Sequence, residues 1–139
     1  CELSAWYLAK LPLLGNLVMK IKVLEQEFAI CKLDSPDQAD LTRPYCFLSR
    51  TEEEISLVCD IEAVPEKTIV CDRGWKAFRI EGTLDFSLVG ILAKISLILA
   101  ENDISIFAVS TFNTDYVLTK KENFERAVSA LAERGYQPV

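Results

Sequence analysis

The reactive side chains of this sequence are limited, because it contains no histidine. That absence excludes Ser-His-Asp and Cys-His nucleophile pairs, histidine general bases and every zinc site built with histidine. No two cysteines share the short spacing of a redox or metal-binding motif. We interpret them as reduced, mostly buried residues of a cytoplasmic protein. The five cysteines are Cys1, Cys31, Cys46, Cys59 and Cys71.

Two carboxylates, Asp85 and Asp115, are the next candidates for chemistry. Paired carboxylates can transfer protons, but nothing in the sequence brings these two together, and no nucleophile has an activating partner. We therefore expect no enzymatic activity. As a binding group, Asp115 is a natural partner for an ammonium or guanidinium group, or else an ordinary turn residue. Asp85 is either a helix cap or a ligand contact.

Other candidate binding groups are backbone amides and hydroxyls. The segment from Phe86 to Val89 is expected at a helix N-terminus, where free N–H groups suit a ligand carboxylate. The hydroxyls and amides of Ser110 and Thr111 are able to orient a polar ligand. Phe112 and Asn113 either frame a pocket or only shape a turn. We predict no cofactor and no metal.

Composition limits the possible partners. The chain has 139 residues, half of them hydrophobic, which suits one domain or two small domains sharing a sheet. A net charge of −6 argues against a nucleic-acid partner. The uncharged stretch Leu11–Met19 is nine residues long and contains Pro12, so it cannot span a bilayer and we expect no membrane partner. Because Met19–Val23 resembles a natural start, we expect residues 1–18 to be an N-terminal extension.

From Trp75 onward the pattern predicts a strand followed by a helix. Trp75–Glu81 is rich in aromatic and β-branched residues and is ended by Gly82. Asp85 or Ser87 is placed to cap a helix that runs to about Asn102. The apolar positions of this helix repeat with helical spacing: Leu88, Ile91, Leu92, Ile95 and Leu99.

The remainder of this half predicts two strands, a helix and a last strand. Ile104–Ser110 carries no charge, which favours a central strand in a covered sheet, and Asp115–Thr119 returns as its partner. A capping box, Thr119-x-x-Glu122, predicts the start of the last helix, and Gly135 predicts its end. Residues 136–139 can close a βαββαβ order, so we predict an α+β, ferredoxin-like fold with helices on one face of an antiparallel sheet.

The first half repeats this order in a shortened form. At an offset of 61 residues Phe47–Thr51 lies over Ala108–Phe112, and Glu54–Val58 lies over the partner strand. The opening strand Glu27–Leu33 matches the second half at an offset of only about 50. The difference falls in the first helix, so Pro36–Leu41 is expected to form little more than one turn.

Two features of the first half admit alternatives. Thr51-x-x-Glu54 also matches a capping box and could begin a helix through Cys59; the repeat favours a turn and a strand, and we follow the repeat. Six acidic residues lie between Glu52 and Glu66, which indicates a solvated face or a screen for a cationic ligand. The predicted organisation is an extension at 1–18, a first unit at 19–74 and a second unit at 75–139.

The sequence resembles small bacterial members of the ACT-domain superfamily that carry two fused ACT-like units, similar to the CASTOR-type amino-acid sensors. The matching residues are the runs Thr51–Cys59, Gly82–Leu92 and Ile104–Tyr116. The resemblance implies regulatory binding of free amino acids at an interface between units. The ligand is expected by the loop between the first strand and first helix, against the second strand of a neighbouring unit.

Carried over by motif, the loop is Thr83–Gly90 and the strand end is Ser110–Asp115, with Gly90 at the family's helix-start glycine. The first half lacks such a glycine, so we do not expect a complete site there. The predicted ligand-binding residues are Asp85, Phe86, Ser87, Leu88, Val89, Gly90, Ser110, Thr111, Phe112, Asn113 and Asp115.

Two functions follow from these observations. The first is a non-catalytic sensor of a free amino acid or similar small ligand, acting as a homodimer because edge strands and half-sites need a partner. The alternative is a structural or protein-interaction module that has lost its ligand. The weak first half favours the alternative, whereas the candidate site in the second half favours the sensor.

Overall fold

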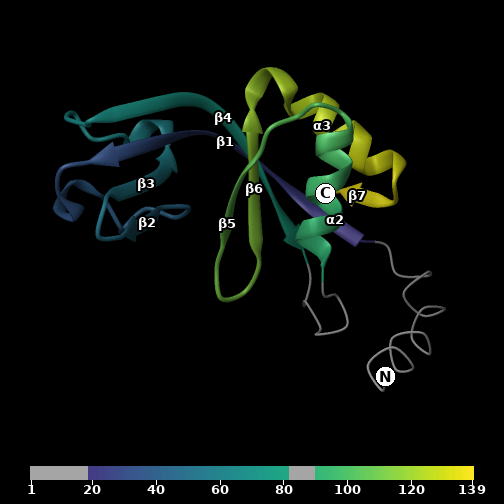
Figure 1. Ribbon diagram of the computed structural model, residues 1–139, viewed down its shortest axis with the longest axis horizontal. Helices are drawn as coiled ribbons and strands as arrows, with labels where there is room; N and C mark the ends of the chain where they lie inside the picture. The colour runs from purple at the N-terminus through teal and green to yellow at the C-terminus, as the bar shows by residue number, and fades with distance from the viewer. Residues whose placement is uncertain (1–18, 82–89) are drawn as a thin grey trace.

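The computed structural model describes residues 19–81 and 90–139. These residues form a mainly antiparallel sheet with two α-helices, an α+β fold (Figure 1). The elements are β1 (Met19–Leu33), the 3₁₀ turn η1 (Pro36–Gln38), β2 (Phe47–Arg50), β3 (Ile55–Asp60), the 3₁₀ turn η2 (Ile61–Ala63), β4 (Val70–Glu81), α2 (Ile91–Glu101), β5 (Phe107–Ser110), β6 (Asp115–Lys120), α3 (Lys121–Glu133) and β7 (Tyr136–Pro138).

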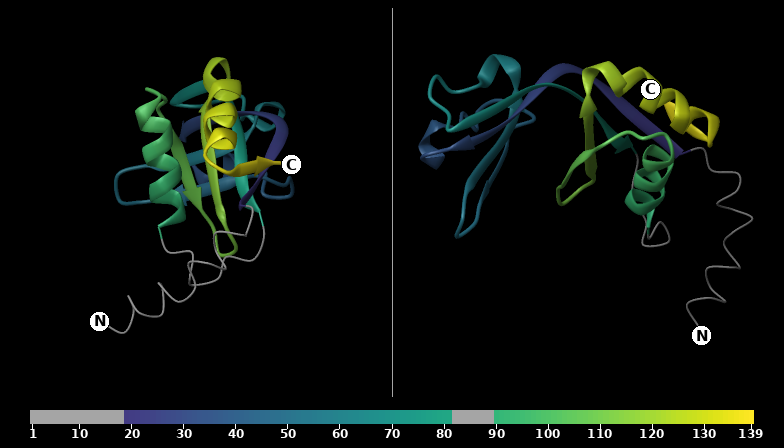
Figure 2. Two further views of the ribbon diagram at one scale, coloured as in Figure 1. Left: turned by 90° about the vertical axis from the view of Figure 1, so that its right-hand side faces the viewer. Right: turned by 45° about the horizontal axis from the view of Figure 1, so that its top comes forward.

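The strand order is β2-β3-β1-β4-β6-β5, and β7 pairs in parallel with the start of β1. Strands β1 and β4 form the centre of the sheet and pair with each other from Lys20↔Glu81 to Lys32↔Val70. The β2–β3 hairpin pairs with the C-terminal part of β1, Phe28–Leu33. The β5–β6 hairpin pairs with Trp75–Arg79 of β4. Both hairpins project in the same direction (Figure 2, right).

A bulge interrupts the pairing of β1 with β4 at the middle of the sheet. Phe28 opposes Trp75 and Ile30 opposes Asp72, so Arg73 and Gly74 together face the single residue Ala29. Gly74 has a φ of 84°, a left-handed conformation that side chains with a Cβ rarely adopt. The bulge allows the sheet to bend between its two ends.

The main core lies between the sheet and the two helices, which occupy the same face (Figures 2, left, and 4). In α2 the residues with helical spacing Ile91, Ile95 and Leu99 are buried, as the sequence predicts. They pack against Phe78 from β4 and Phe124 from α3, together with the other members of one cluster. Thr119, although polar, is also fully buried, next to this layer in β6.

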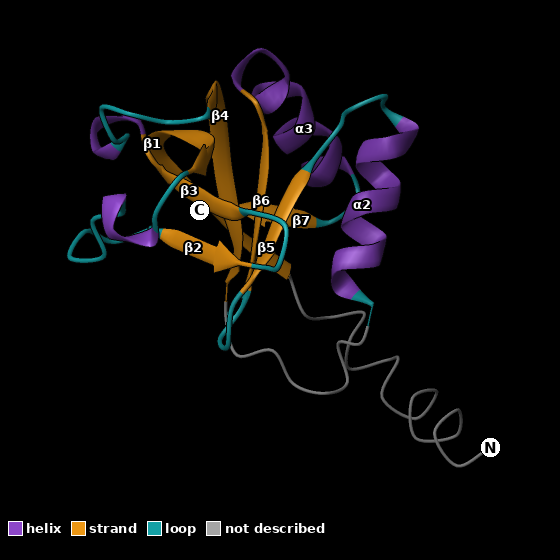
Figure 3. Cartoon of the chain, turned by 60° about the vertical axis from the view of Figure 1, so that its left-hand side comes forward, coloured by secondary structure: helices purple, strands orange, loops and turns teal. Residues whose placement is uncertain are grey.

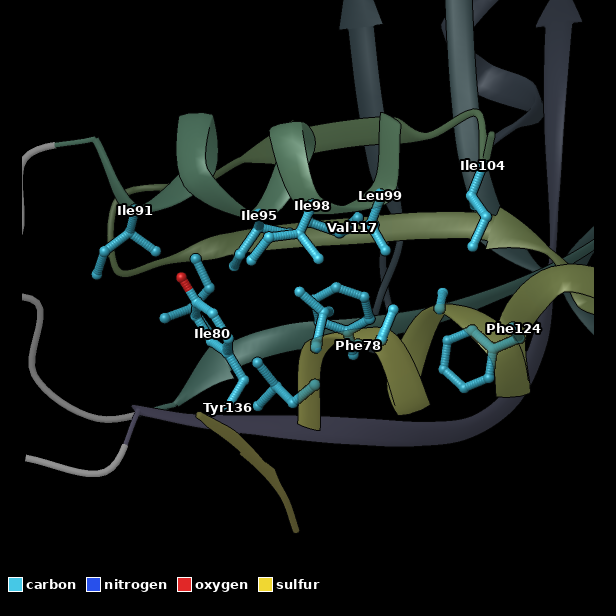
Figure 4. Packing of buried hydrophobic residues seen from close by; sticks show 14 residues of the cluster. Phe78, Ile80, Ile91, Ile95, Ile98, Leu99, Ile104, Val117, Phe124 and Tyr136 are labelled. Carbon is cyan, nitrogen blue, oxygen red and sulfur yellow. The ribbon is translucent and has the colours of Figure 1, made fainter. Parts of the chain in front are cut away.

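The sheet curls so that its other face is concave (Figure 3). This concave face carries a second cluster, rich in aromatic side chains. Its buried members include Phe28 and Trp75. Phe47 from β2 reaches Tyr116 from β6, so side chains from the two hairpins meet across the concave face. The sheet is therefore curled.

A third cluster fills the first half, which has no α-helix among its described residues. Short 3₁₀ turns stand where the second half has helices: η1 spans Pro36–Gln38, matching the predicted single turn, and η2 spans Ile61–Ala63. This cluster contains all four described cysteines, which form no disulfide. Of these four, Cys31 and Cys59 are buried, as predicted, whereas Cys46 and Cys71 are half-buried.

The structure confirms the turn and strand at Thr51 and corrects the offset of the repeat. Thr51 and Glu54 close a turn, and β3 follows directly, so no helix begins there. Strands β2 and β5, and likewise β3 and β6, begin 60 residues apart, not 61. The repeat counterpart of Asp115 is consequently Ile55, and Glu54 corresponds to Thr114.

Two predictions about the second half are wrong. Ile104–Ser110 is not a central strand: β5 starts at Phe107 and stands at the end of the strand order. Ile104 and Ile106 are apolar because they pack on the helical core from the connection after α2. The capping box at Thr119 does not form, because that residue belongs to β6 and α3 begins at Lys121 without a side-chain cap.

The predicted helix starts at Asp85 and Ser87 lie outside the described residues, and α2 itself begins at Ile91 after Gly90. Strand β4 begins at Val70, five residues before the predicted start at Trp75. None of the helices in residues 19–81 and 90–139 is both long and apolar enough to cross a membrane.

Candidate functional site

The β5–β6 hairpin holds most of the predicted site residues that the structure describes. Ser110 pairs with Asp115 at the last step of the ladder. The Thr111 N–H donates to the Thr114 carbonyl at 2.9 Å, and the Thr111 hydroxyl donates to the same oxygen at 2.8 Å. Phe112 and Asn113 therefore form the tip, where the Phe112 side chain is fully exposed. Within one chain the Phe112 side chain therefore projects into solvent.

This hairpin is fixed to the end of β4, the strand that precedes the predicted ligand loop in the sequence. The Thr114 hydroxyl donates to the Ile80 carbonyl at 2.7 Å. Strand β4 ends one residue later, at Glu81. The hairpin tip and the start of α2 lie at the same end of the molecule (Figure 1). The five predicted residues Asp85, Phe86, Ser87, Leu88 and Val89 lie outside the described residues.

Gly90 immediately precedes α2 and has a φ of 87°. An added Cβ would meet nothing within 4 Å, so the glycine is required by its backbone conformation and not by crowding. The helix start has no side-chain cap, and the Gly90 carbonyl accepts the first helical hydrogen bond from Lys94 at 2.9 Å.

The structure adds a charged group that the sequence reasoning missed. On the concave face Arg79 donates through Nε to Glu81 at 3.0 Å, and Tyr116 stands opposite Arg79 in the β4–β6 ladder. Hydrogen bonds to Glu81 and to Tyr116 raise the pKa of the guanidinium, which therefore stays charged. The i, i+2 spacing of Arg79 and Glu81 in a predicted strand already places both on one face, and that signal could have identified them.

A pocket of about 270 Å³ lies at the equivalent end of the first half, between the end of β1 and the β2–β3 turn. Its lining carries both signs of charge: Lys32 and Arg50 are cationic, whereas Asp34 and Glu52–Glu54 are anionic. Leu33, Ile55 and Ile69 supply apolar walls. An amino acid also combines a cation, an anion and apolar surface, so the pocket matches its chemistry.

The turn beside this pocket shares its closing backbone hydrogen bond with the β5–β6 turn. The Thr51 N–H donates to the Glu54 carbonyl at 2.9 Å, as Thr111 does to Thr114. The Thr51 hydroxyl accepts the amides of Glu53 and Glu54, both at 3.2 Å. The sequence predicts no complete site in the first half, because that half lacks a helix-start glycine. The 60-residue equivalence of the two turns is the signal that could have indicated the pocket.

The segment between β1 and β2 covers the same end of the first half with the 3₁₀ turn η1 and no α-helix. Ser35 caps η1, and the Gln38 side chain donates to the Lys67 carbonyl at 2.8 Å. The Ile69 amide donates to the Lys32 carbonyl at 2.8 Å, so two pocket residues are joined through the backbone. The described residues contain no cluster of three or more histidine, cysteine or acidic side chains arranged to hold a metal ion.

Comparison with known proteins identifies the fold. Residues 70–133 match the family model described as ACT domain. A solved protein from Agobacterium tumefaciens is 31% identical, with a TM-score of 0.79 over 88% of this chain and 93% of its own. The ligand-free regulatory subunit of aspartate kinase from Thermus thermophilus shares the fold alone, at 14% identity and a TM-score of 0.59, with 84% of this chain and 98% of its own covered. The ACT-domain match over residues 70–133 and the shared α+β fold together identify the family: the chain belongs to the ACT-domain superfamily.

A sequence relative carries a functional name. The human cytosolic arginine sensor for mTORC1 subunit 1 is 32% identical over 107 residues, which are 72% of this chain. The orangutan (Pongo abelii) protein of the same name matches equally. The chain spans about a third of the length of these relatives, 32%. ACT domains are regulatory, amino-acid-binding modules, and the named relatives are a sensor and a regulatory subunit.

Proposed function

We propose that this protein is a non-catalytic regulatory protein that binds a free amino acid or a similar small ligand. The observation that carries the proposal is the pocket beside the Thr51–Glu54 turn, whose lining presents cations, carboxylates and apolar walls together. Lys32 and Arg50 are suited to a ligand carboxylate, and Glu54 to a ligand ammonium group. An intracellular location, as the name of the arginine sensor states for that protein, is part of this proposal.

The ligand is expected to carry a positive or zero net charge. Four carboxylates, those of Asp34 and Glu52–Glu54, outnumber the two cations of the lining. A ligand with an extra carboxylate would add to this excess, whereas a basic side chain would reduce it. Arginine and lysine are therefore better candidates than aspartate and glutamate.

We include the second half in the proposal as an equivalent site, completed at an interface between ACT units. Its residues are those predicted from the sequence: Asp85 to Gly90 and Ser110 to Asp115, without Thr114. The exposed tip supports this, because Phe112 needs a neighbouring surface to become part of a site. We propose tandem units at 19–74 and 75–139 in a homodimer, since β2 and β5 end the strand order of the described residues.

A thermal-shift screen against the twenty amino acids tests the proposal. A ligand at 100 times its dissociation constant adds about 2.7 kcal/mol to the free energy of unfolding, a clear rise in melting temperature. Arg50→Ala should abolish the shift if the first-half pocket is used, and Asp115→Ala should abolish it if the second site is used. Glu133→Ala, an exposed change in α3, is the matched control. Absence of any shift contradicts the proposal.

A protein-interaction module is the second candidate, and the fully exposed Phe112 favours it. On this alternative, amino acids leave the melting temperature unchanged and Phe112→Ser abolishes binding to a stoichiometric partner. Sedimentation equilibrium of the wild type and of Phe112→Ser then decides whether that partner is a second copy of the chain.

A further inference from the structure

The four described cysteines gather around the third cluster, in the half of the protein that holds the pocket. Cys31 and Cys59 are buried, whereas Cys46 and Cys71 are half-buried. Nothing in the proposed ligand binding uses these thiols. Their arrangement singles out one pair: the sulfur atoms of Cys31 and Cys71 are in contact and the two residues directly oppose each other in a ladder, whereas Cys59, which also contacts the Cys31 thiol, does not oppose it.

Cys31 and Cys71 face each other directly across β1 and β4. They are register partners in an antiparallel ladder, and their Sγ atoms are 3.5 Å apart. Directly opposed residues in such a ladder have Cα atoms about 4.5–5.5 Å apart, within the range of about 4.4–6.8 Å that a disulfide spans. A disulfide therefore requires rotation of the two side chains and no separation of the strands.

The neighbouring thiol of Cys59 is less well placed for the same bond. Cys59 opposes Ala29 in the β1–β3 ladder, whereas Cys31 opposes Leu57. Cys59 and Cys31 are thus diagonal neighbours, which places their Cα atoms about 7–8 Å apart. That separation exceeds what a disulfide tolerates without backbone movement.

We propose that Cys31 and Cys71 are a thiol-oxidation site, converted by hydrogen peroxide into a reversible intramolecular disulfide. The site goes beyond the proposed ligand binding and does not depend on it. The half-buried Cys71 is accessible to a small oxidant, whereas Cys31 is only 3% exposed and acts as the resolving thiol.

The chemistry balances with peroxide as the only co-reactant. The Cys71 thiolate attacks one peroxide oxygen, the O–O bond breaks, and the departing hydroxide takes up the thiol proton to leave as water. The Cys71 sulfenic acid is then attacked by Cys31 Sγ, the S–O bond breaks, and the Cys31 proton leaves with the second water. Two thiols lose two electrons, and one peroxide gains them.

The disulfide would lie next to the pocket. Lys32 follows Cys31, and Val70, which precedes Cys71, is the register partner of Lys32. Ile69, another pocket residue, bonds to the Lys32 carbonyl. Oxidation therefore clamps together the two strands that form one wall of the pocket.

Peptide mapping tests the proposal directly, because trypsin places each described cysteine in its own peptide. Cys31 lies in peptide 23–32 and Cys71 in peptide 68–73, whereas Cys46 and Cys59 lie in 33–50 and 51–67. After peroxide treatment and blocking of free thiols, we expect peptides 23–32 and 68–73 to be joined and then released by dithiothreitol. The melting temperature should rise by several degrees on oxidation and fall again on reduction.

Variants separate this site from other thiol chemistry. Cys71→Ser, a substitution at a half-buried position, should abolish both the link between the two peptides and the rise in melting temperature on oxidation. Cys71→Ala should do the same. Cys46→Ser should leave both unchanged. A link to peptide 33–50 or 51–67, a cross-link between two chains, or irreversible oxidation of Cys71 with Cys31 still free would each overturn the proposal.

Discussion

The rings of Phe47 and Tyr116 lie with their centroids 4.9 Å apart, although three strands separate β2 from β6 in the strand order. Tyr45 adds an edge contact to Tyr116, with centroids 6.1 Å apart. Phe47 and Tyr116 do not occupy equivalent positions of the repeat, because the equivalent of Phe47 is Phe107. The contact therefore belongs to the packing of one half against the other, and it closes the concave face.

Removal of either ring should destabilise the whole described fold. We expect Phe47→Ala to lower the free energy of unfolding by about 2–3 kcal/mol, less than for a fully buried ring because both rings are half-buried. A double-mutant cycle with Tyr116→Ala should give a coupling of about 0.5–1.5 kcal/mol by urea denaturation. Additive effects would show that the two halves do not support each other through this contact.

The bulge at Gly74 should be sensitive to any side chain. Gly74→Ala forces a Cβ into a φ of 84°, and we expect a loss of about 1–2 kcal/mol in the free energy of unfolding. The space itself is available, since the nearest atom to an added Cβ is the Lys121 side chain at 3.8 Å. Gly74→Asn is the control, because asparagine tolerates this conformation better and should lose less. Equal losses for alanine and asparagine would indicate crowding and not conformation.

The hydrogen bond from Thr114 to Ile80 should contribute to the order of the β5–β6 hairpin. Thr114→Val keeps the shape but removes the donor, and we expect a loss of about 1 kcal/mol in thermal or urea unfolding. Thr114→Ser retains the hydroxyl and should remain close to the wild type. Hydrogen exchange of the Thr111 amide, which bonds to the Thr114 carbonyl, should become faster in the valine variant only.

Stability should decrease in alkali because of the buried thiols. Burial, first, and then the contact with Cys71 raise the pKa of Cys31 from 9.0 to about 12, and burial raises that of Cys59 to about 11. The folded state thus holds these protons more tightly than the unfolded state. The stabilisation is complete below about pH 9 and is lost as the pH rises towards 12.

Urea denaturation at pH 8 and pH 11, with reducing agent present, measures this effect. Cys31→Ala should show a smaller decrease between the two pH values than the wild type. Leu33→Val is the control, because it trims the same buried cluster without a titrating group and should keep the wild-type pH dependence. The expectation fails if Cys31→Ala and the wild type lose the same free energy.

The elements of the second half follow from the sequence because their patterns are local. Helical spacing identifies the buried residues of α2 and of α3, where Phe124, Ala127 and Leu131 are buried. Gly135, with a φ of 95°, ends α3 as expected. Such signals depend on neighbours within a few residues, so they can be recognised in the sequence without knowledge of the fold.

The features that sequence reasoning missed depend on distant partners. The absence of charge in a strand is typical of a central position in a covered sheet, yet β5 stands at the end of the strand order. Its apolar residues Phe107 and Val109 pack on the concave cluster instead. The first-half pocket forms where β1 meets the β2–β3 turn, which no local pattern indicates. The position of the ligand loop after β4 stays a prediction, because it lies outside the described residues.

The two central strands make the halves of this repeat inseparable. Met19–Val23, at the start of β1, lies between β4 and β7, so the second half uses a strand from the beginning of the chain. A fragment that begins at Trp75 would lack this strand and would also start inside β4. Strands β1 and β4 run from the pocket to the core beneath the helices, so a change at either end acts on the same two strands.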